Sequence, residues 1–238
     1  MRWFALLSAL TFATAAYLAA APPQGASSPR AGSSQTSAQA PARTLPPDVD
    51  PESFNRLPRV RREDLDDAGK KAYDAVAGDG RLLGLEGPIG IRMHSPPVSE
   101  YMTMGNQYLR FGAGIEPRLM ELAILVVARE MDSQFEWTAH EPPALRAGLE
   151  QRIIDTVKFR LPVVGLPDKE AAIVQLGREA LGRRRVEPET FARALKLFGR
   201  QGVVNIVSLM SHYAATAMLL TTFDQQLRPG QQPLLPLP

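Results

Sequence analysis

The stretch between Gly202 and Leu227 constrains the fold of this chain more than any other, because its middle is almost wholly apolar: VVNIVSLMSHYAATAMLL. We interpret it as one long terminal helix. A helix that is apolar on most of its sides has to be buried on most of its sides. We therefore expect it to pack against the rest of its domain and, over part of its surface, against another subunit.

The rest of the domain also has helical patterning. Alternating apolar and polar runs joined by hairpin turns, which mark strands, are absent. Proline at helix starts and glycine at helix ends divide the chain into segments. The fold class predicted is all-α in one domain, with helices over Glu63–Ala77, 96–111, 117–130, 133–147, Glu150–Phe159, 168–184, 187–199 and Gly202–Leu227.

Two stretches interrupt this pattern. LLGLEGPIGIRMHSPP contains glycine and proline throughout and is interpreted as a loop. Pro142 and Pro143 fall inside a helical segment, so we expect a kink near His140.

Four segments of different composition follow one another along the chain. Residues 1–21 have Arg2 followed by an apolar run, as in a secretory signal or an N-terminal anchor. Residues 22–50 are rich in Pro, Ala and Ser and are expected to be a disordered linker. The helical domain is placed at 51–228 and an extended tail at 229–238. We favour export to a periplasm or beyond, and expect membrane contact only if the first segment stays uncleaved.

Composition excludes several classes of function. The sequence has no cysteine, so thiol chemistry, disulfides and cysteine-based zinc sites are excluded. A formal net charge of +2 gives no argument for nucleic-acid binding, and no nucleic-acid motif is present.

The residues that can carry chemistry cluster between positions 121 and 148. Ser133, Glu136, Trp137 and His140 are spaced i, i+3, i+4 and i+7, so they share one helix face. An imidazole titrates near neutrality and suits acid–base work. Glu121 lies on the preceding apolar helix, where it either orients His140 or pairs on the surface with a nearby arginine.

This region, ELAILVVAREMDSQFEWTAHEPPALRAG, resembles the carboxymuconolactone decarboxylase family, which includes the AhpD-like alkylhydroperoxidases. The redox branch of that family has a helix Glu, a Cys-x-x-Cys and a His four residues on. Glu121 and His140 match; Ser133 and Glu136 stand where the two cysteines would be. The resemblance implies an AhpD-like helical bundle, homotrimers or homohexamers, and a cofactor-free lyase that decarboxylates or isomerises a small carboxylated lactone or organic acid.

In that interpretation Glu121, Glu136 and His140 are catalytic, with His140 moving the proton. The substrate-binding candidates are Gln134, Trp137, Arg92 and His94. Arginine binds carboxylates bidentately. Two of them also have a structural interpretation: Trp137 as core, His94 as a helix cap. His212, on the terminal helix, is interpreted as a core or interface histidine.

Other possibilities stay open at this stage. Glu121, Glu136, His140 and His212 offer metal ligands, but no metal-binding signature is present, so no metal is predicted. An AhpD-like peroxidase is disfavoured by the missing cysteines. A non-catalytic exported binding or assembly module is the remaining alternative, and it is distinguished by whether Glu121 and His140 converge in one pocket.

Overall fold

The computed structural model describes residues 44–77 and 85–237 of the chain. The predicted signal segment and residues 22–43 of the predicted linker lie outside the described residues. The described part belongs to one compact unit, Ala42–Pro238. It contains helices and no strand, which confirms the all-α prediction. Its helices are α1 (Asp67–Ala77), α2 (Gly87–Arg92), α3 (Pro96–Gln107), α4 (Pro117–Glu130), α5 (Gln134–Arg146), α6 (Gln151–Lys158), α7 (Asp168–Gly177) and α8 (Pro188–Thr222).

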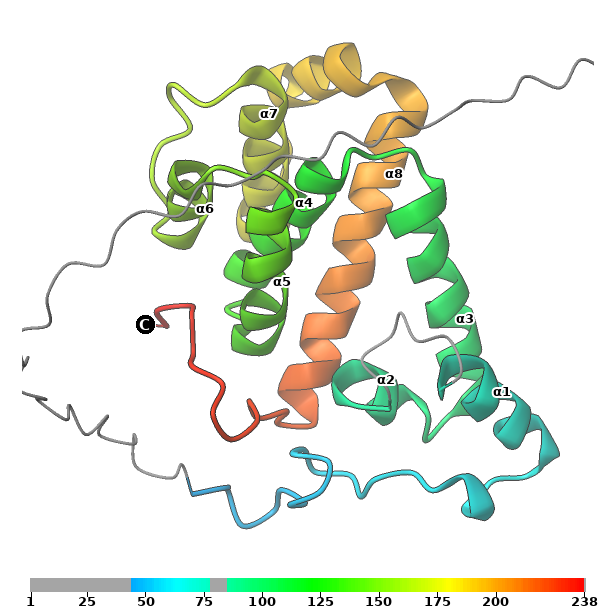
Figure 1. The fold of residues 1–238 in the computed structure, drawn as a ribbon. Helices are drawn as coiled ribbons and strands as arrows, with labels where there is room; N and C mark the ends of the chain where they lie inside the picture. The colour runs from blue at the N-terminus through cyan, green and yellow to red at the C-terminus, as the bar shows by residue number, and fades with distance from the viewer. Residues whose placement is uncertain (1–43, 78–84, 238) are drawn as a thin grey trace, which may run out of the picture. The chain divides into compact units, whose positions relative to one another are not determined.

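Helix α4 is the centre of the core. Every residue from Leu119 to Arg129 is buried, because α5, α7, α8 and α6 all pack against it. Leu122, Ile124 and Leu125 have no exposed surface. Figure 1 shows α8 running between α4 and α5 on one side and α3 on the other. The apolar run of α4 is therefore the element around which the site residues are arranged.

Helix α8 contains the long apolar stretch near the C-terminus. It includes the two predicted helices, separated by a break at Gly199, whose φ of 68° and ψ of 176° are not helical. Glycine adopts this φ without the steric cost that a side chain would add. The prediction that helix continues to Leu227 is wrong. It ends at Thr222, and Asp224 takes a left-handed φ of 48°, which turns the chain back toward the N-terminal segment.

By length and composition α8 is also, within the described part of the chain, the one helix that could cross a membrane. Half of its most apolar window is buried within the protein, against α4, α7 and α3. A core helix of a soluble protein has the same length and composition, so this feature is weak evidence for a membrane span.

Several predicted boundaries need correction. The first helix begins at Asp67 instead of Glu63, after a short 3₁₀ turn at Arg62–Asp64. The predicted glycine- and proline-rich loop contains α2, because Pro88 stands at the start of a helix, where proline is favoured. Helix α5 continues through both of its prolines to Arg146.

Two helices end in π-helical turns that the sequence analysis did not predict. These are η2 (Tyr108–Gly112) after α3 and η3 (Arg178–Arg183) after α7. A π-turn inserts an extra residue and changes which side chains face the core.

Both ends of the domain are more ordered than predicted. Residues 44–50 belong to the folded unit: Val49 is buried, and Asp48 pairs with Arg56 at 2.7 Å. In the predicted extended tail, Leu235 is buried and the Pro236 carbonyl accepts a hydrogen bond from Arg129 at 2.7 Å. The apolar side chains in these segments find room on the helical core, and this burial offsets the ordering entropy.

Candidate functional site

The site begins with a buried pair between α4 and α5. His140 Nδ1 lies 2.7 Å from Glu121 Oε2, and the two residues are 9% and 3% exposed. The prediction that these groups come within hydrogen-bonding reach is confirmed. It follows from the short 131–133 link, which folds α5 back against α4.

Arg110 completes this pair, and the sequence analysis did not find it. Its Nη2 donates to Glu121 Oε1 at 3.0 Å, so both carboxylate oxygens accept hydrogen bonds. The alternative in which Glu121 pairs on the surface with a nearby arginine is not what the structure shows, since Glu121 is buried and Arg118 pairs with Glu116 and Glu170. Arg110 lies in η2, and the extra residue of that π-turn decides its direction. Helical spacing read from the sequence carries no signal for such a turn.

This geometry sets the roles of the two imidazole nitrogens. A carboxylate flanked by a guanidinium accepts hydrogen bonds, so Nδ1 of His140 donates to Glu121. Nε2 then keeps its lone pair and can accept a proton. A carboxylate behind a histidine fixes the tautomer in this way in many acid–base sites.

Glu136 lies on the other side of the imidazole, one turn before His140. Its Oε2 is 3.5 Å from His140 Nε2, and its side chain is buried. Burial raises the pKa of Glu136, and the charges of His140 and Arg92 oppose that rise. A carboxyl with a raised pKa holds its proton to a higher pH than an ordinary carboxyl and can donate it.

Glu136 and His140 line a cavity of about 360 Å³, which is within the range of small-molecule sites. Its wall comes from α2, the end of α3, α5, α8 and the segment after α8. Glu121 does not line this cavity, which corrects the prediction that it faces the pocket. It lies behind His140. The lining residues are Ser53, Glu86, Gly87, Pro88, Ile89, Arg92, Asn106, Arg110, Phe135, Glu136, Thr138, Ala139, His140, His212, Tyr213, Thr216, Gln225, Leu227, Arg228 and Gln231.

Arg92 is a cavity residue, as predicted. It is 8% exposed, and its Nη2 donates a short hydrogen bond to the Thr216 hydroxyl on α8. Burial lowers the pKa of Arg92, while Glu136 raises it. No carboxylate in the described part of the chain lies within ion-pair distance of Arg92. Its guanidinium is therefore a buried positive charge at the cavity wall, which suits an anionic ligand.

Two aromatic residues of α8 complete the wall. Tyr213 packs edge-on against the His140 ring, with centroids 5.1 Å apart, and His212 packs against Tyr213 at 5.6 Å. Burial raises the pKa of Tyr213. Burial, helped by the charge of Arg92, lowers the pKa of His212 to about 4. His212 was expected to be a core or interface histidine, and Tyr213 was not expected at the site, because i, i+4 patterns within one helix do not show what faces a different helix.

Three predicted binding residues lie away from the cavity. Trp137 is fully buried in the core, where its indole N–H donates to Glu141. Gln134 bonds to the Thr138 hydroxyl at 3.0 Å and, with its amide turned, to the backbone of Leu234 and Leu235. These contacts hold the C-terminal tail against α5.

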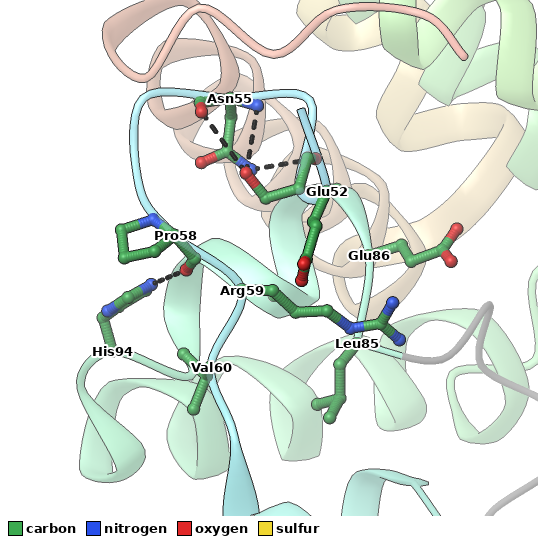
Figure 2. Close-up of a pocket in the computed structure, with 11 residues that line it drawn as sticks. Glu52, Asn55, Pro58, Arg59, Val60, Leu85, Glu86 and His94 are labelled. Carbon is green, nitrogen blue, oxygen red and sulfur yellow. Dashed lines mark hydrogen bonds between the residues drawn. The ribbon is translucent and has the colours of Figure 1, made fainter. Parts of the chain in front are cut away.

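His94 belongs to a different pocket. Figure 2 shows its ring bonded to the Pro58 carbonyl, at 2.9 Å. That pocket has a volume of only about 10 Å³, enough for about one water molecule. The prediction that His94 binds substrate together with Arg92 is therefore not supported by its position: the two side chains diverge at the end of α2.

The described residues contain no group of three or more His, Asp or Glu side chains arranged to hold a metal ion. Glu121 and Glu136 instead lie at different nitrogens of the His140 imidazole, Glu121 at Nδ1 and Glu136 at Nε2. That arrangement suits proton movement through His140.

No protein-family model matches this chain, and no curated protein matches it significantly. The functional argument therefore depends on the geometry of the site.

Proposed function

We propose that this protein is a cofactor-free acid–base enzyme acting on a small organic acid, by decarboxylation or isomerisation. One observation carries the proposal. The imidazole of His140 is held at Nδ1 by Glu121, while Nε2 lies beside Glu136 at a cavity that also contains the buried guanidinium of Arg92, which has no carboxylate partner in the part of the chain that the structure describes.

The chemistry assigns a role to each group. Arg92 binds the substrate carboxylate, since it is the buried cation of the wall that has no carboxylate partner among the described residues. His140 Nε2 takes or returns a proton at the reacting carbon. Glu121 and Arg110 hold the imidazole in the required tautomer. Glu136 exchanges the proton with His140 or with the substrate, as its raised pKa allows.

The resemblance to the carboxymuconolactone decarboxylase family supports this proposal at two residues. Glu121 and His140 match that family's pattern and here lie in hydrogen-bond contact. We propose an AhpD-like bundle and a carboxylated lactone or related acid as substrate. Export to the periplasm or beyond also stays a prediction, because it depends on residues 1–21.

The alternatives differ in what the cavity does. An AhpD-like peroxidase mechanism needs a cysteine thiolate, and the sequence contains no cysteine. A non-catalytic binding module would hold an acid at Arg92 and leave it unchanged. An enzyme and a binding module differ in whether the hydrogen atoms of the bound acid exchange with solvent.

The test is proton exchange in deuterated water, followed by proton nuclear magnetic resonance on a panel of carboxylated lactones and 2-oxo and 3-oxo acids. We expect one member of the panel to exchange or lose carbon dioxide. His140→Ala should lower the rate by about 10²–10⁴-fold, and His94→Ala should leave it unchanged. Glu121→Gln should also be slow, and the double variant little slower than His140→Ala alone.

Two results would overturn the proposal. One is full activity in His140→Ala. The other is tight binding of an acid by the wild-type protein without exchange or turnover of any panel member, which is what a binding module would show.

A further inference from the structure

Tyr213 is a buried polar residue of this cavity to which the proposed proton transfer assigns no role. It is 5% exposed and lines the cavity beside His140. Among the described residues its hydroxyl has no hydrogen-bond partner, although Tyr and Trp polar groups usually find one when buried. A buried phenol that lines a cavity and lacks a protein partner is available to a ligand.

The charges around Tyr213 are those of the site itself. Arg110, Glu136, Glu121 and Arg92 all act on its hydroxyl. Burial has the largest effect, and it keeps the phenol protonated. Tyr213 is therefore a neutral hydrogen-bond donor at the point where these charges converge.

The position of Tyr213 next to His140 restricts which substrate atoms can accept a hydrogen bond from the Tyr213 hydroxyl. Its ring stands edge-on to the imidazole at a centroid distance of 5.1 Å. A substrate carbon within reach of His140 Nε2 therefore has its substituents close to Tyr213. Arg110 is bonded to Glu121 and Arg92 to Thr216, so each has at least one donor already occupied by the protein.

We propose that the Tyr213 hydroxyl donates a hydrogen bond to an oxyanion that develops on the substrate, and that the substrate therefore carries a carbonyl group next to the reacting carbon. This inference depends on the proposed function. His140 removes the proton from that carbon, or the bond to the carboxylate breaks and carbon dioxide leaves. In either case the electron pair passes into a new carbon–carbon double bond, and the carbonyl oxygen becomes the oxyanion. Tyr213 keeps its proton throughout. After proton removal, His140 returns that proton to the substrate; after loss of carbon dioxide, a protonated His140 donates a proton to the carbon and regains one from water.

The substrate class is thereby narrowed to a small oxo acid or a carboxylated lactone, with its carboxylate at Arg92 and its carbonyl oxygen at Tyr213. A preorganised donor at a developing oxyanion contributes about 10²–10³-fold in rate. Its effect falls on kcat, since the donor is used more strongly in the transition state than in the ground state.

The first measurement is calorimetric titration with oxalate, which has the charge and shape of an enolate of a 2-oxo acid, and with propanoate, which lacks the second oxygen pair. Tyr213→Phe keeps the ring and its packing. We expect it to weaken oxalate binding at least about tenfold and to leave propanoate binding unchanged. Tyr101→Phe, at a surface tyrosine 77% exposed, is the matched control and should bind both like the wild type.

The second measurement is the exchange assay, in which Tyr213→Phe should lower kcat by about 10²-fold with little change in KM. Equal oxalate affinity in the wild type and Tyr213→Phe would overturn the proposal, as would failure of the wild type to bind oxalate. Selective loss of oxalate binding without turnover of any acid would support Tyr213 as the oxyanion donor and count against the proposed function instead. Thermal melting of Tyr213→Phe confirms that the variant is folded.

Discussion

At the scale of single residues, the site depends on one imidazole held between two carboxyl groups in different environments. Both carboxyl groups are buried. Glu121 accepts hydrogen bonds from Arg110 and from His140, whereas Glu136 makes only a longer contact of 3.5 Å to the imidazole. This difference lets one carboxyl orient the imidazole and the other exchange a proton. In the proposed mechanism, two carboxyl groups of the same residue type take separate roles because their partners differ.

A second histidine makes the stability of the protein depend on pH. His212 is partly buried beside Arg92, and its pKa in the folded state is lowered to about 4, against an ordinary value near 6.5. A base with a lowered folded pKa contributes its stability above pH 6.5 and loses it as the pH falls toward 4. We expect the wild type to lose about 1–2 kcal/mol through His212 over this range, after allowance for solvent screening.

Urea denaturation at about pH 7.5 and about pH 5 measures this loss. His212→Asn should reduce the dependence on pH, and His94→Asn, at an exposed histidine, should keep that of the wild type. The raised pKa of Glu136 makes stability rise as the pH falls, which opposes the effect of His212. The effect of His212 is therefore measured as the difference in pH dependence between the variant and the wild type. An identical pH dependence in His212→Asn and wild type would show that His212 is not the cause.

At the scale of elements, close contact between helices α4 and α7 fixes the core. Gly177 lies where α7 meets α4, and a Cβ at this position would collide with the side chain of Val126. The absence of a side chain lets the two helices approach, and α4 carries Glu121 five residues before Val126. The position of the site therefore depends on a small residue in a different helix.

Gly177→Ala should destabilise the protein by about 1–3 kcal/mol, because the core has to shift to admit the methyl group. The matched control is Gly105→Ala in α3, where an added Cβ meets nothing within 4 Å. That change should stabilise by roughly 0.5–1 kcal/mol through helix propensity. Urea denaturation measures both, and equal stability of the two variants would contradict the close-packing argument.

At the scale of the whole molecule, two helices leave apolar side chains exposed. Val204 and Met218 on α8 are 62% and 63% exposed, and Tyr101 and Met104 on α3 are 77% and 65% exposed. The two helices contact each other. Apolar surface of this kind marks interaction sites in soluble proteins. Whether the terminal helix contributes to contacts between subunits stays a prediction.

We predict that the chain self-associates, as a trimer or hexamer, through this surface. Light scattering at micromolar concentration should give a mass several times that of one chain. The double variant Val204→Glu, Met218→Glu should shift the mass toward the monomer, whereas Val164→Glu, at a loop residue 90% exposed, should not. A clean monomer for the wild type would contradict the prediction.

The sequence by itself determined the all-helical fold, most helix positions and the pairing of Glu121 with His140. The reason is local: apolar periodicity, proline and glycine positions and a three-residue link between helices are all properties of neighbouring residues. The predicted segment boundaries were wrong where tertiary contacts decide the course of the chain. Leu227 was expected in a helix, but the chain turns back at Asp224, and the apolar side chains of both ends pack on the core.

Only the tertiary structure decided the rest of the site. Arg110 lies in a π-turn and bonds to Glu121 from there. Arg92 belongs to a helix within a stretch rich in glycine and proline. Tyr213, more than seventy residues after His140 in the sequence, packs against its ring. Trp137 and His94, which lie close to site residues in sequence, face other surroundings. Residues of separate helices come together through packing, and the spacing within any one helix does not specify which of its faces will meet the others.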